Sequence, residues 1–249
     1  MDRRGFIKTA GAGALALSAP NLAGAQNAKV LRFVPQANLA NLDPIWGTQY
    51  VVRNGSLMIW DTLYGVDENL QPRPQMVEAH EASPDFKTWT MRLRPGLKFH
   101  DGEPVLAKDA VASIERWMAR DGAMGVPIKR RLDALEVVDD RTFRFRLNLP
   151  YPKLAFALGK CATPCCFVMP ERIAKTDPFK QVTEYVGSGP MKFVRNEWVP
   201  GARAVFETFT DYKPRDEPNS WLAGGKRMLV DRVEWVIMPD AATASAALQ

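Results

Sequence analysis

Residues 187–193 read Gly-Ser-Gly-Pro-Met-Lys-Phe, and this stretch decides how the second half of the 249-residue chain folds. Both glycines can adopt positive φ, and Pro190 fixes its own φ and disfavours helical geometry in the residue before it. Residues 192–199 and 202–209 are rich in Phe, Val and Trp, so they predict two strands that turn at Pro200-Gly201. Taken alone, the pattern predicts a β-hairpin entered through a rigid turn.

The composition is that of a folded globular chain. Hydrophobic residues make up 46% and charged residues 24%, which argues against disorder. A chain of 249 residues can bury a substantial core, as one large domain or two smaller ones. The formal net charge is only +5, and basic and acidic residues are interleaved. Nucleic-acid binding requires a concentrated basic face, so we expect no nucleic-acid partner.

The N-terminus has the features of an export signal. Arg3 and Arg4 lie in a segment that resembles the twin-arginine export motif, and a weakly apolar run and an Ala-Gly-Ala sequence, with Ala23 and Ala25, follow. The run is too short and too glycine-rich to span a bilayer, so residues 1–25 are predicted to be a cleaved signal peptide. An amphipathic N-terminal helix is the alternative, although glycine makes it a poor one. We therefore expect a soluble periplasmic protein after cleavage.

Hydrophobic periodicity predicts the main elements between these two regions. Alternating apolar residues or short apolar runs predict strands over 30–34, 88–93, 135–138, 142–147 and 229–238. Helical spacing predicts helices over 50–63 and 107–118, a short helix through Phe156, and a helix that starts after Asp240. Residues 119–128 contain two glycines and a proline, and are predicted to form a loop.

Three motifs in this order resemble solute-binding protein family 5, the extracytoplasmic peptide- and oligopeptide-binding components of ABC importers. The first is Leu42-Asp43-Pro44 before a helix, and the second is the string LRPGLKFHDGEPVLAKDAVASIERW at residues 93–117. The third is the 187–193 turn with its Trp-x-Pro-Gly sequence and a closing Asp211-Tyr212. Leu106 stands where the family usually has Ser or Thr, so the helix after it lacks a side-chain cap typically worth about 1 kcal/mol.

The resemblance implies an α/β fold, the first lobe of a type II periplasmic binding protein of the peptide-binding class. It implies a mixed-sheet core subdomain from residues 28–60 and 183–249 and an inserted β-rich subdomain from residues 61–182. Family members are much longer than this chain, so the second lobe is expected to be absent from it. Either the chain is a fragment or a separate chain supplies the rest.

The resemblance also implies the function. The complete protein would bind a short peptide or similar small solute between two lobes, act as a monomer, need no cofactor, and deliver the solute to an ABC permease. In the family, the loop after the Leu-Asp-Pro turn faces the cleft. The implied ligand-binding residues here are Trp46, Thr48, Gln49, Tyr50, Met124 and Gly125. Tyr50 could instead only start a helix, and Trp46 could only pack beneath it.

Two other functions compete with solute import. A periplasmic sensor could use the same binding fold, and an exported hydrolase would need converging catalytic groups. His100-Asp101 is the one adjacent pair that suggests acid–base chemistry, but neighbours in a turn seldom have the required geometry. We therefore expect no enzyme activity.

Three cysteines lie close together at Cys161, Cys165 and Cys166. Zinc would need a fourth ligand, and both histidines are far away in sequence, so no metal site is expected. The cysteines could form one local disulfide in an oxidising compartment, or a buried inert cluster.

Overall fold

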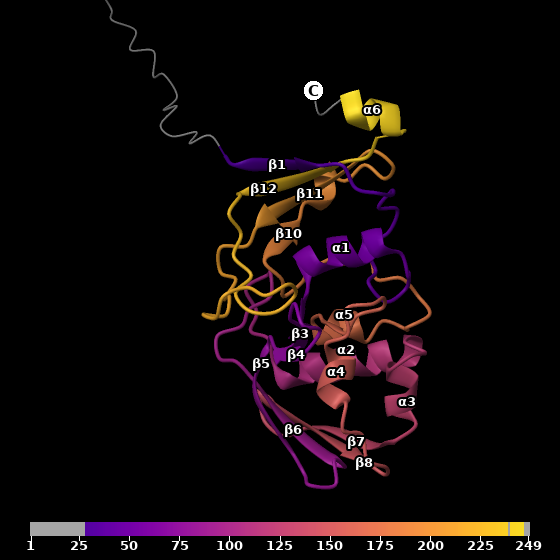
Figure 1. The fold of residues 1–249 in the computed structure, drawn as a ribbon, viewed down its shortest axis with the longest axis vertical. Helices are drawn as coiled ribbons and strands as arrows, with labels where there is room; N and C mark the ends of the chain where they lie inside the picture. Colours follow the sequence, from indigo (N-terminus) through magenta and orange to yellow (C-terminus); the bar gives the residue numbers. More distant parts are fainter. Residues whose placement is uncertain (1–27, 239, 247–249) are drawn as a thin grey trace, which may run out of the picture.

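The computed structural model describes residues 28–238 and 240–246, so the predicted signal peptide lies outside the described residues. Figure 1 shows a β-sheet at each end of an elongated molecule, with helices between them. The helices are α1 Tyr50–Ile59, α2 Ala107–Arg120, α3 Gly125–Lys129, α4 Leu154–Leu158, α5 Glu171–Ala174 and α6 Ala241–Ala246, with a short 3₁₀ helix η1 at Arg195–Glu197. No helix in these two ranges combines the length and the apolar character needed to cross a membrane.

The first sheet joins the two ends of the described chain. It contains β1 Val30–Phe33, β10 Met191–Phe193, β11 Arg203–Thr208 and β12 Arg232–Val236, in the order β1-β12-β11-β10. β1 runs parallel to β12, and the other pairs are antiparallel, so the sheet is mixed as expected. Its inner face packs on α1 around Phe206 and Trp235 (Figure 1).

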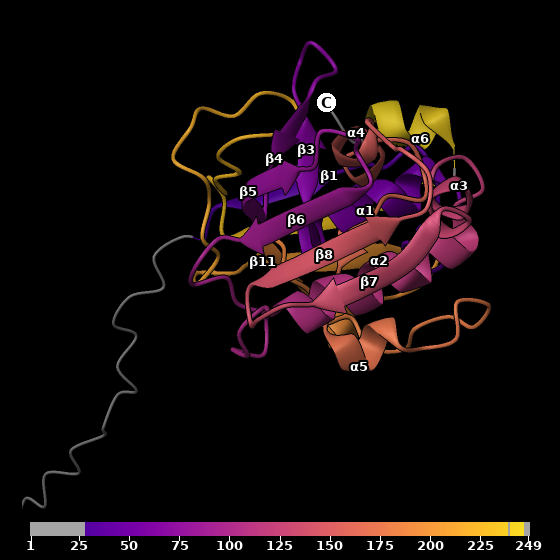
Figure 2. The same cartoon turned by 90° about the horizontal axis from the view of Figure 1, so that it is seen from below.

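The second sheet is antiparallel and comes from the middle of the chain. It contains β5 Val77–Ala82, β6 Thr88–Leu93, β7 Leu132–Val137 and β8 Thr142–Leu147, in the order β5-β6-β8-β7. Its apolar face, including Met91, Phe143 and Phe145, packs against α2 (Figure 2). Two smaller pairs complete the fold: β2 Asp61–Thr62 with β9 Phe167–Val168, and β3 Tyr64–Val66 with β4 Pro72–Pro74.

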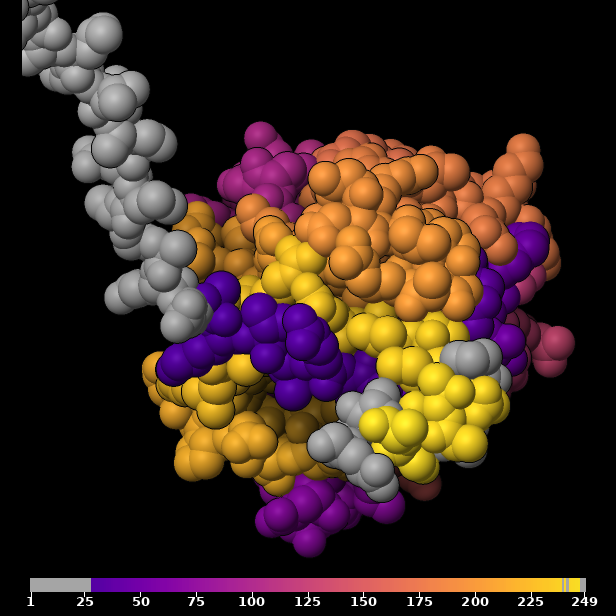
Figure 3. All heavy atoms as spheres, turned by 90° about the horizontal axis from the view of Figure 1, so that it is seen from above, coloured from indigo at the N-terminus to yellow at the C-terminus, as the bar shows by residue number. Residues whose placement is uncertain are grey.

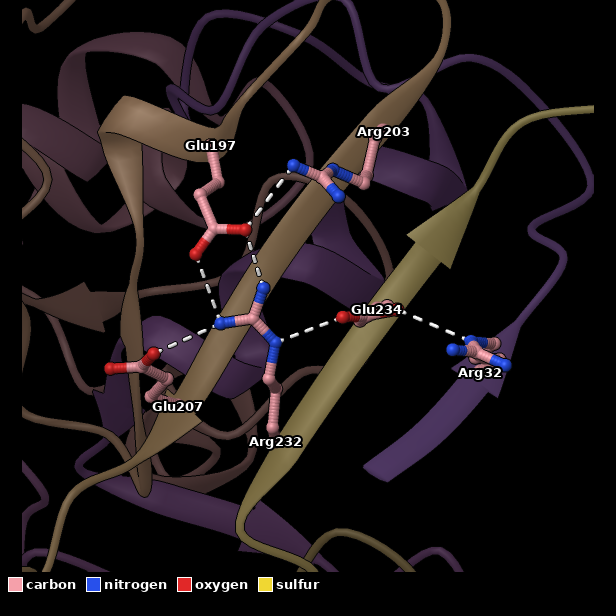
Figure 4. Close-up of polar contacts among 6 residues, drawn as sticks. All are labelled: Arg32, Glu197, Arg203, Glu207, Arg232 and Glu234. Atoms are coloured by element: carbon pink, nitrogen blue, oxygen red, sulfur yellow. Dashed lines mark hydrogen bonds and ion pairs between the residues drawn. The ribbon is translucent and has the colours of Figure 1, made fainter. Parts of the chain in front are cut away.

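The outer face of the first sheet is covered by charged side chains. Viewed from above, the N-terminal strand lies beside the late strand β12 (Figure 3). A ladder of ion pairs crosses this face (Figure 4), made by Arg32, Glu197, Arg203, Glu207, Arg232 and Glu234. Arg232 is its centre, with its Nε 2.9 Å from Glu234 and its Nη1 3.0 Å from Glu207. Because the six charges cancel, the ladder keeps this face polar without making it a strongly charged surface.

The predicted hairpin of residues 192–209 is present, but its first strand is shorter than expected. β10 ends at Phe193, and η1 replaces the rest of the predicted strand. Trp198, directly after η1, packs edge-on against Phe193, with 5.6 Å between the ring centroids. The two strands pair at Phe193 and Phe206, and Gly201 has φ +85° in the turn.

Gly187 and Gly189 are required for a reason that the sequence does not reveal. Neither has positive φ, so access to the left-handed region is not what this turn requires of them. Their backbone instead lies against the end of α1. A Cβ on Gly187 would be 1.9 Å from the carbonyl oxygen of Ile59, and one on Gly189 would be 2.7 Å from the Ile59 carbonyl carbon. Ser188 completes this junction, since its hydroxyl donates to the Val168 carbonyl at 2.8 Å and accepts the Asp61 N–H at 3.0 Å.

Other predicted boundaries also differ from the structure, those of α1 and of residues 119–128 among them. α1 ends at Ile59 rather than at residue 63, because the Gly189 N–H donates to the Ile59 carbonyl oxygen at 2.8 Å. The chain then continues as β2, which pairs with β9. Residues 119–128 are not entirely a loop, since α3 begins at Gly125. The carboxylate of Asp121 accepts the Gly125 N–H at 3.2 Å and so satisfies a free donor at the start of α3. The predicted strands 88–93 and 142–147 are confirmed.

The close approach of Gly187 to Ile59 can be tested by adding a methyl group. We expect Gly187→Ala to lower the free energy of unfolding by about 3 kcal/mol, because the clash is with backbone that cannot rotate away. Gly122→Ala is the control, since a Cβ there has no heavy atom within 4 Å. Urea denaturation of both variants measures the difference, and equal stability would contradict this account of the turn.

Candidate functional site

A buried ion pair holds the loop that contains four of the predicted ligand-binding residues. Asp43 and Arg116 side chains are each 1% exposed, with Nη2 to Oδ2 at 2.8 Å and Nη1 to Oδ1 at 3.1 Å. Asp43 also accepts the backbone N–H groups of Ile45, Trp46 and Val182. Burial alone would raise the pKa of Asp43, but the hydrogen bond and charge of Arg116 hold that pKa below its ordinary value.

Arg116 connects the same loop to a third segment. Its Nε donates to the Thr176 carbonyl at 3.2 Å, and its Nη2 donates to the Lys180 carbonyl at 3.0 Å. All partners of the pair are therefore inside the protein, which is the condition under which a buried ion pair is tolerated. The Leu-Asp-Pro motif and the Glu-Arg-Trp end of the second motif are thus two halves of one contact.

Most of residues 46–50, which follow this anchor in the chain, are exposed. Trp46, Thr48, Gln49 and Tyr50 are all exposed, and α1 begins at Tyr50. Tyr50 starts the helix but is 59% exposed, so packing does not account for its ring. Trp46 is 37% exposed, so it does not simply pack beneath the helix.

Polar contacts hold residues 160–163 between this loop and the turn before α3. The Thr163 hydroxyl donates to the Thr48 carbonyl at 2.8 Å, and Arg53 Nη1 donates to the Cys161 carbonyl at 2.9 Å. On the other side, Lys160 Nζ lies 2.7 Å from Asp121, in the turn that precedes α3. Residues 160–163 therefore bridge the loop at 46–50 and the turn before Met124.

The two remaining predicted site residues, Met124 and Gly125, lie in different surroundings. Met124 is half-buried, and its sulfur accepts the Tyr151 hydroxyl at 3.8 Å. Gly125 is buried, and a Cβ there would be 2.8 Å from the Met118 Cα, so close helix packing explains this glycine. Neither residue has a contact with residues 46–50 comparable to that of Thr163.

Sequence reasoning missed two arginines that stack on the exposed aromatic rings. The Arg53 guanidinium lies 4.6 Å from the Tyr50 ring centroid. The Arg120 guanidinium lies 5.4 Å from the Trp46 ring and 5.0 Å from the Phe179 ring. The three-residue spacing of Tyr50 and Arg53 on a helix is a signal that could have found the first stack. Nothing local in the sequence links Phe179 to Trp46.

His100 and Asp101 point to different partners and do not form an acid–base pair. The His100 ring accepts the Gly187 N–H at Nδ1, 3.2 Å, and donates from Nε2 to the Gly189 carbonyl, 3.0 Å. Asp101 instead pairs with Arg172 at 2.8 Å. Burial lowers the pKa of His100 to about 4, so the ring is neutral and holds the glycine turn in place.

The cysteines form no disulfide with one another. All three are free, with Cys165 and Cys166 buried and Cys161 half-buried. Burial raises the pKa of the Cys165 thiol to about 12 and also raises that of Cys166. The buried, inert alternative therefore holds for these two. Within residues 28–238 and 240–246, no group of three or more His, Cys, Asp or Glu side chains is placed to hold a metal ion.

The comparison with known families identifies the class of protein. The model of bacterial extracellular solute-binding proteins, family 5, matches residues 71–249. The chain therefore belongs to this family, and its fold is part of the type II periplasmic binding protein fold. The family consists of solute-binding proteins that act outside the cytoplasm.

Individual relatives share the sequence and the fold over part of their length. A probable peptide ABC transporter periplasmic-binding protein of Sinorhizobium fredii is 41% identical over 100% of this chain and 47% of its own length. The structure of AgaA from A. tumefaciens with agropinic acid matches with TM-score 0.71 and 26% identity, over 88% of this chain and 42% of that one. The structure of DppA from Helicobacter pylori with the peptide STSA matches with TM-score 0.69 and 26% identity, over 88% of this chain and 44% of that one. The chain thus spans less than half of each of these proteins.

Removing the charge of Asp43 tests the anchor of the loop. We expect Asp43→Asn to lower the free energy of unfolding by about 3–5 kcal/mol, because Arg116 would remain buried without a counter-charge. Asp211→Asn is the control, since Asp211 pairs with Lys98 at 2.9 Å but both side chains are about half exposed. Chemical denaturation at pH 7 measures the free energy of unfolding of both variants, and we expect no measurable change in the control. An equal loss of stability in both variants would show that the burial of the Asp43 pair is irrelevant.

The low pKa of His100 predicts a pH dependence of stability. The folded-state pKa of about 4 lies below the ordinary 6.5, so the unfolded chain binds the proton first as the pH falls. The contribution of the neutral ring to the free energy of unfolding is fully present above pH 6.5. It falls by about 3 kcal/mol as the pH approaches 4. His100→Gln should remove this part of the slope. Unfolding free energies of both proteins at pH 7 and pH 4.5 measure it, and parallel pH profiles would exclude His100 as the source.

Proposed function

We propose that the complete protein is the extracytoplasmic solute-binding component of an ABC importer, and that it binds a short peptide or a similar small solute. Membership in family 5 supports the class of protein. Peptide is favoured because the Sinorhizobium fredii relative is named for peptide transport and the Helicobacter pylori neighbour is described with a bound peptide. The partner would be a permease in the inner membrane, and the binding protein would act as a monomer.

The observation that carries the proposal at the residue level is the exposed loop at residues 46–50 on a rigid base. Its anchor is the buried Asp43–Arg116 pair, and its neighbour is the segment that carries Thr163. Exposed aromatic rings on a fixed backbone are suited to contact a solute at low entropic cost. We propose Trp46, Thr48, Gln49 and Tyr50 as ligand contacts, with Met124 as a second, more distant contact and Gly125 as its structural support.

The subdomain division is part of the same proposal. We propose that residues 28–60 and 183–249 form the core subdomain and residues 61–182 the inserted one. The strands of the first sheet fall in the former ranges and those of the second sheet in the latter, which supports this division. We further propose export through the twin-arginine route, from Arg3 and Arg4, and binding without catalysis, which is supported by the divergence of His100 and Asp101.

Native mass spectrometry of the full-length protein, purified without added ligand, tests the function. We expect a peptide-sized solute to co-purify, because a closed two-lobe cleft retains what it binds. A co-purified sugar or chelate would contradict the peptide proposal but keep the transport one. Turnover of the solute by the purified protein would contradict both.

The loop itself is tested by truncating an aromatic ring. We expect Tyr50→Ala to weaken binding of a co-purified or added peptide by about tenfold, the loss typical of an exposed aromatic contact that becomes buried by ligand. Trp221→Ala is the matched control, since Trp221 is also exposed at 53% and lies in a different loop. Calorimetric titration of the full-length variants compares them; equal affinities would place the site elsewhere.

A further inference from the structure

Arg53 is a cation without an acidic partner beside the proposed ligand loop. It lies in the first turn of α1, one helical turn after Tyr50, and that turn contains no acidic residue. Among the ion pairs of the described residues none includes Arg53. A cation near the N-terminal end of a helix is unfavourable for the helix dipole, so local helix stability does not explain this arginine.

The guanidinium of Arg53 is nevertheless held in one orientation. Its Cζ atom lies 4.6 Å from the centroid of the exposed Tyr50 ring. Nε and Nη2 donate to the Asn54 side-chain oxygen at 3.2 and 2.9 Å, and Nη1 donates to the Cys161 carbonyl at 2.9 Å. These contacts come from the helix, from the neighbouring segment and from an aromatic ring, so the group is positioned before any ligand arrives.

The hydrogen bonds leave the donors that a carboxylate requires. A guanidinium carries five N–H groups, one on Nε and two on each terminal nitrogen. The bonds to Asn54 and Cys161 use one N–H on each of the three nitrogens, so one remains on Nη1 and one on Nη2. One N–H on each terminal nitrogen is therefore free to bond an oxygen of an anion, and charge-assisted bonds from arginine to carboxylate oxygens are among the stronger ones in proteins.

We propose that Arg53 receives a carboxylate of the bound solute, so that the site selects solutes with an acidic group. The inference rests on the proposed function of residues 46–50 and adds the chemical class of the solute. The carboxylate could be the C-terminus of a peptide, an acidic side chain or a small organic acid, since all three offer the same two oxygens. Tyr50 supplies an apolar surface beside the charge, and its ring keeps the guanidinium from swinging away.

Thermal-shift and calorimetric titrations of the full-length protein test the proposal with defined probes. These are trialanine, trialanine amide, Ala-Glu-Ala amide, glutarate and an uncharged disaccharide. We expect the wild-type protein to bind at least one carboxylate-bearing probe about tenfold or more tightly than trialanine amide, the value expected for a charge-assisted hydrogen bond. Trialanine reports a C-terminal carboxylate, Ala-Glu-Ala amide a side chain, and glutarate a free acid.

Variants then assign the preference to Arg53. Arg53→Gln should abolish it with little effect on trialanine amide, and Arg53→Lys should restore part of it, because lysine keeps the charge but not the paired donors. Arg131→Gln is the matched control, since Arg131 also stacks on a tyrosine, Tyr151 at 5.7 Å, and bonds a backbone carbonyl. It should keep the wild-type preference.

The other outcomes separate the inference from the proposed function. Tight binding of the disaccharide or of trialanine amide alone would overturn the role of Arg53 and leave solute binding intact. A carboxylate preference that survives in Arg53→Gln would do the same. A protein that binds none of the probes and carries no co-purified solute would overturn both.

Discussion

Asp43 and Arg116 meet in the interior through two charge-assisted hydrogen bonds, and much of the described structure depends on this pair. It joins the loop before α1, the middle of α2 and the segment at residues 176–182 at one point. A buried pair adds little net stability compared with apolar packing, but its geometry permits only one arrangement of the three segments. Such rigidity would suit the ligand contact proposed for residues 46–50, because rigid presentation lowers the entropic cost of holding a solute.

A second junction depends on two glycines, Gly187 and Gly189, because a side chain at either position would clash with the end of α1. The turn at residues 187–189 lies directly against the end of α1, with His100 bonded to both sides of it. Ser188 and Asp61 then carry the contact to β2 and β9, and Asp61 in turn accepts from Tyr212 at 2.8 Å and pairs with Lys226 at 2.6 Å. The motifs that resemble family 5 are therefore not separate signatures. They contact one another and form the junction between the two sheets.

Local pattern predicted the fold well where packing follows periodicity. The alternation in residues 88–93 and 142–147 and the apolar stripe of α2 are direct consequences of one buried face, so the sequence was sufficient for them. It failed where a distant segment decides the outcome. The end of α1 is set by Gly189, and the function of Gly187 depends on Ile59, more than a hundred residues away in the chain. The candidate site shows the same division: the resemblance pointed to residues 46–50, whose binding role stays a prediction, whereas the contacts of Arg53 with Cys161 and of Arg120 with Phe179 are tertiary contacts that no local window contains.

The parallel pairing of β1 with β12 has a consequence for the order in which the chain can fold. The two strands are joined by contacts across 202 residues, such as that between Arg32 and Glu234. On a ribosome, β1 is made first and must wait for nearly all the described chain before its partner exists. The second sheet and α2 use much nearer contacts and can form earlier. During that interval Leu31 and Phe33 have no sheet to join, so the apolar side chains of this strand stay available for pairing with other chains.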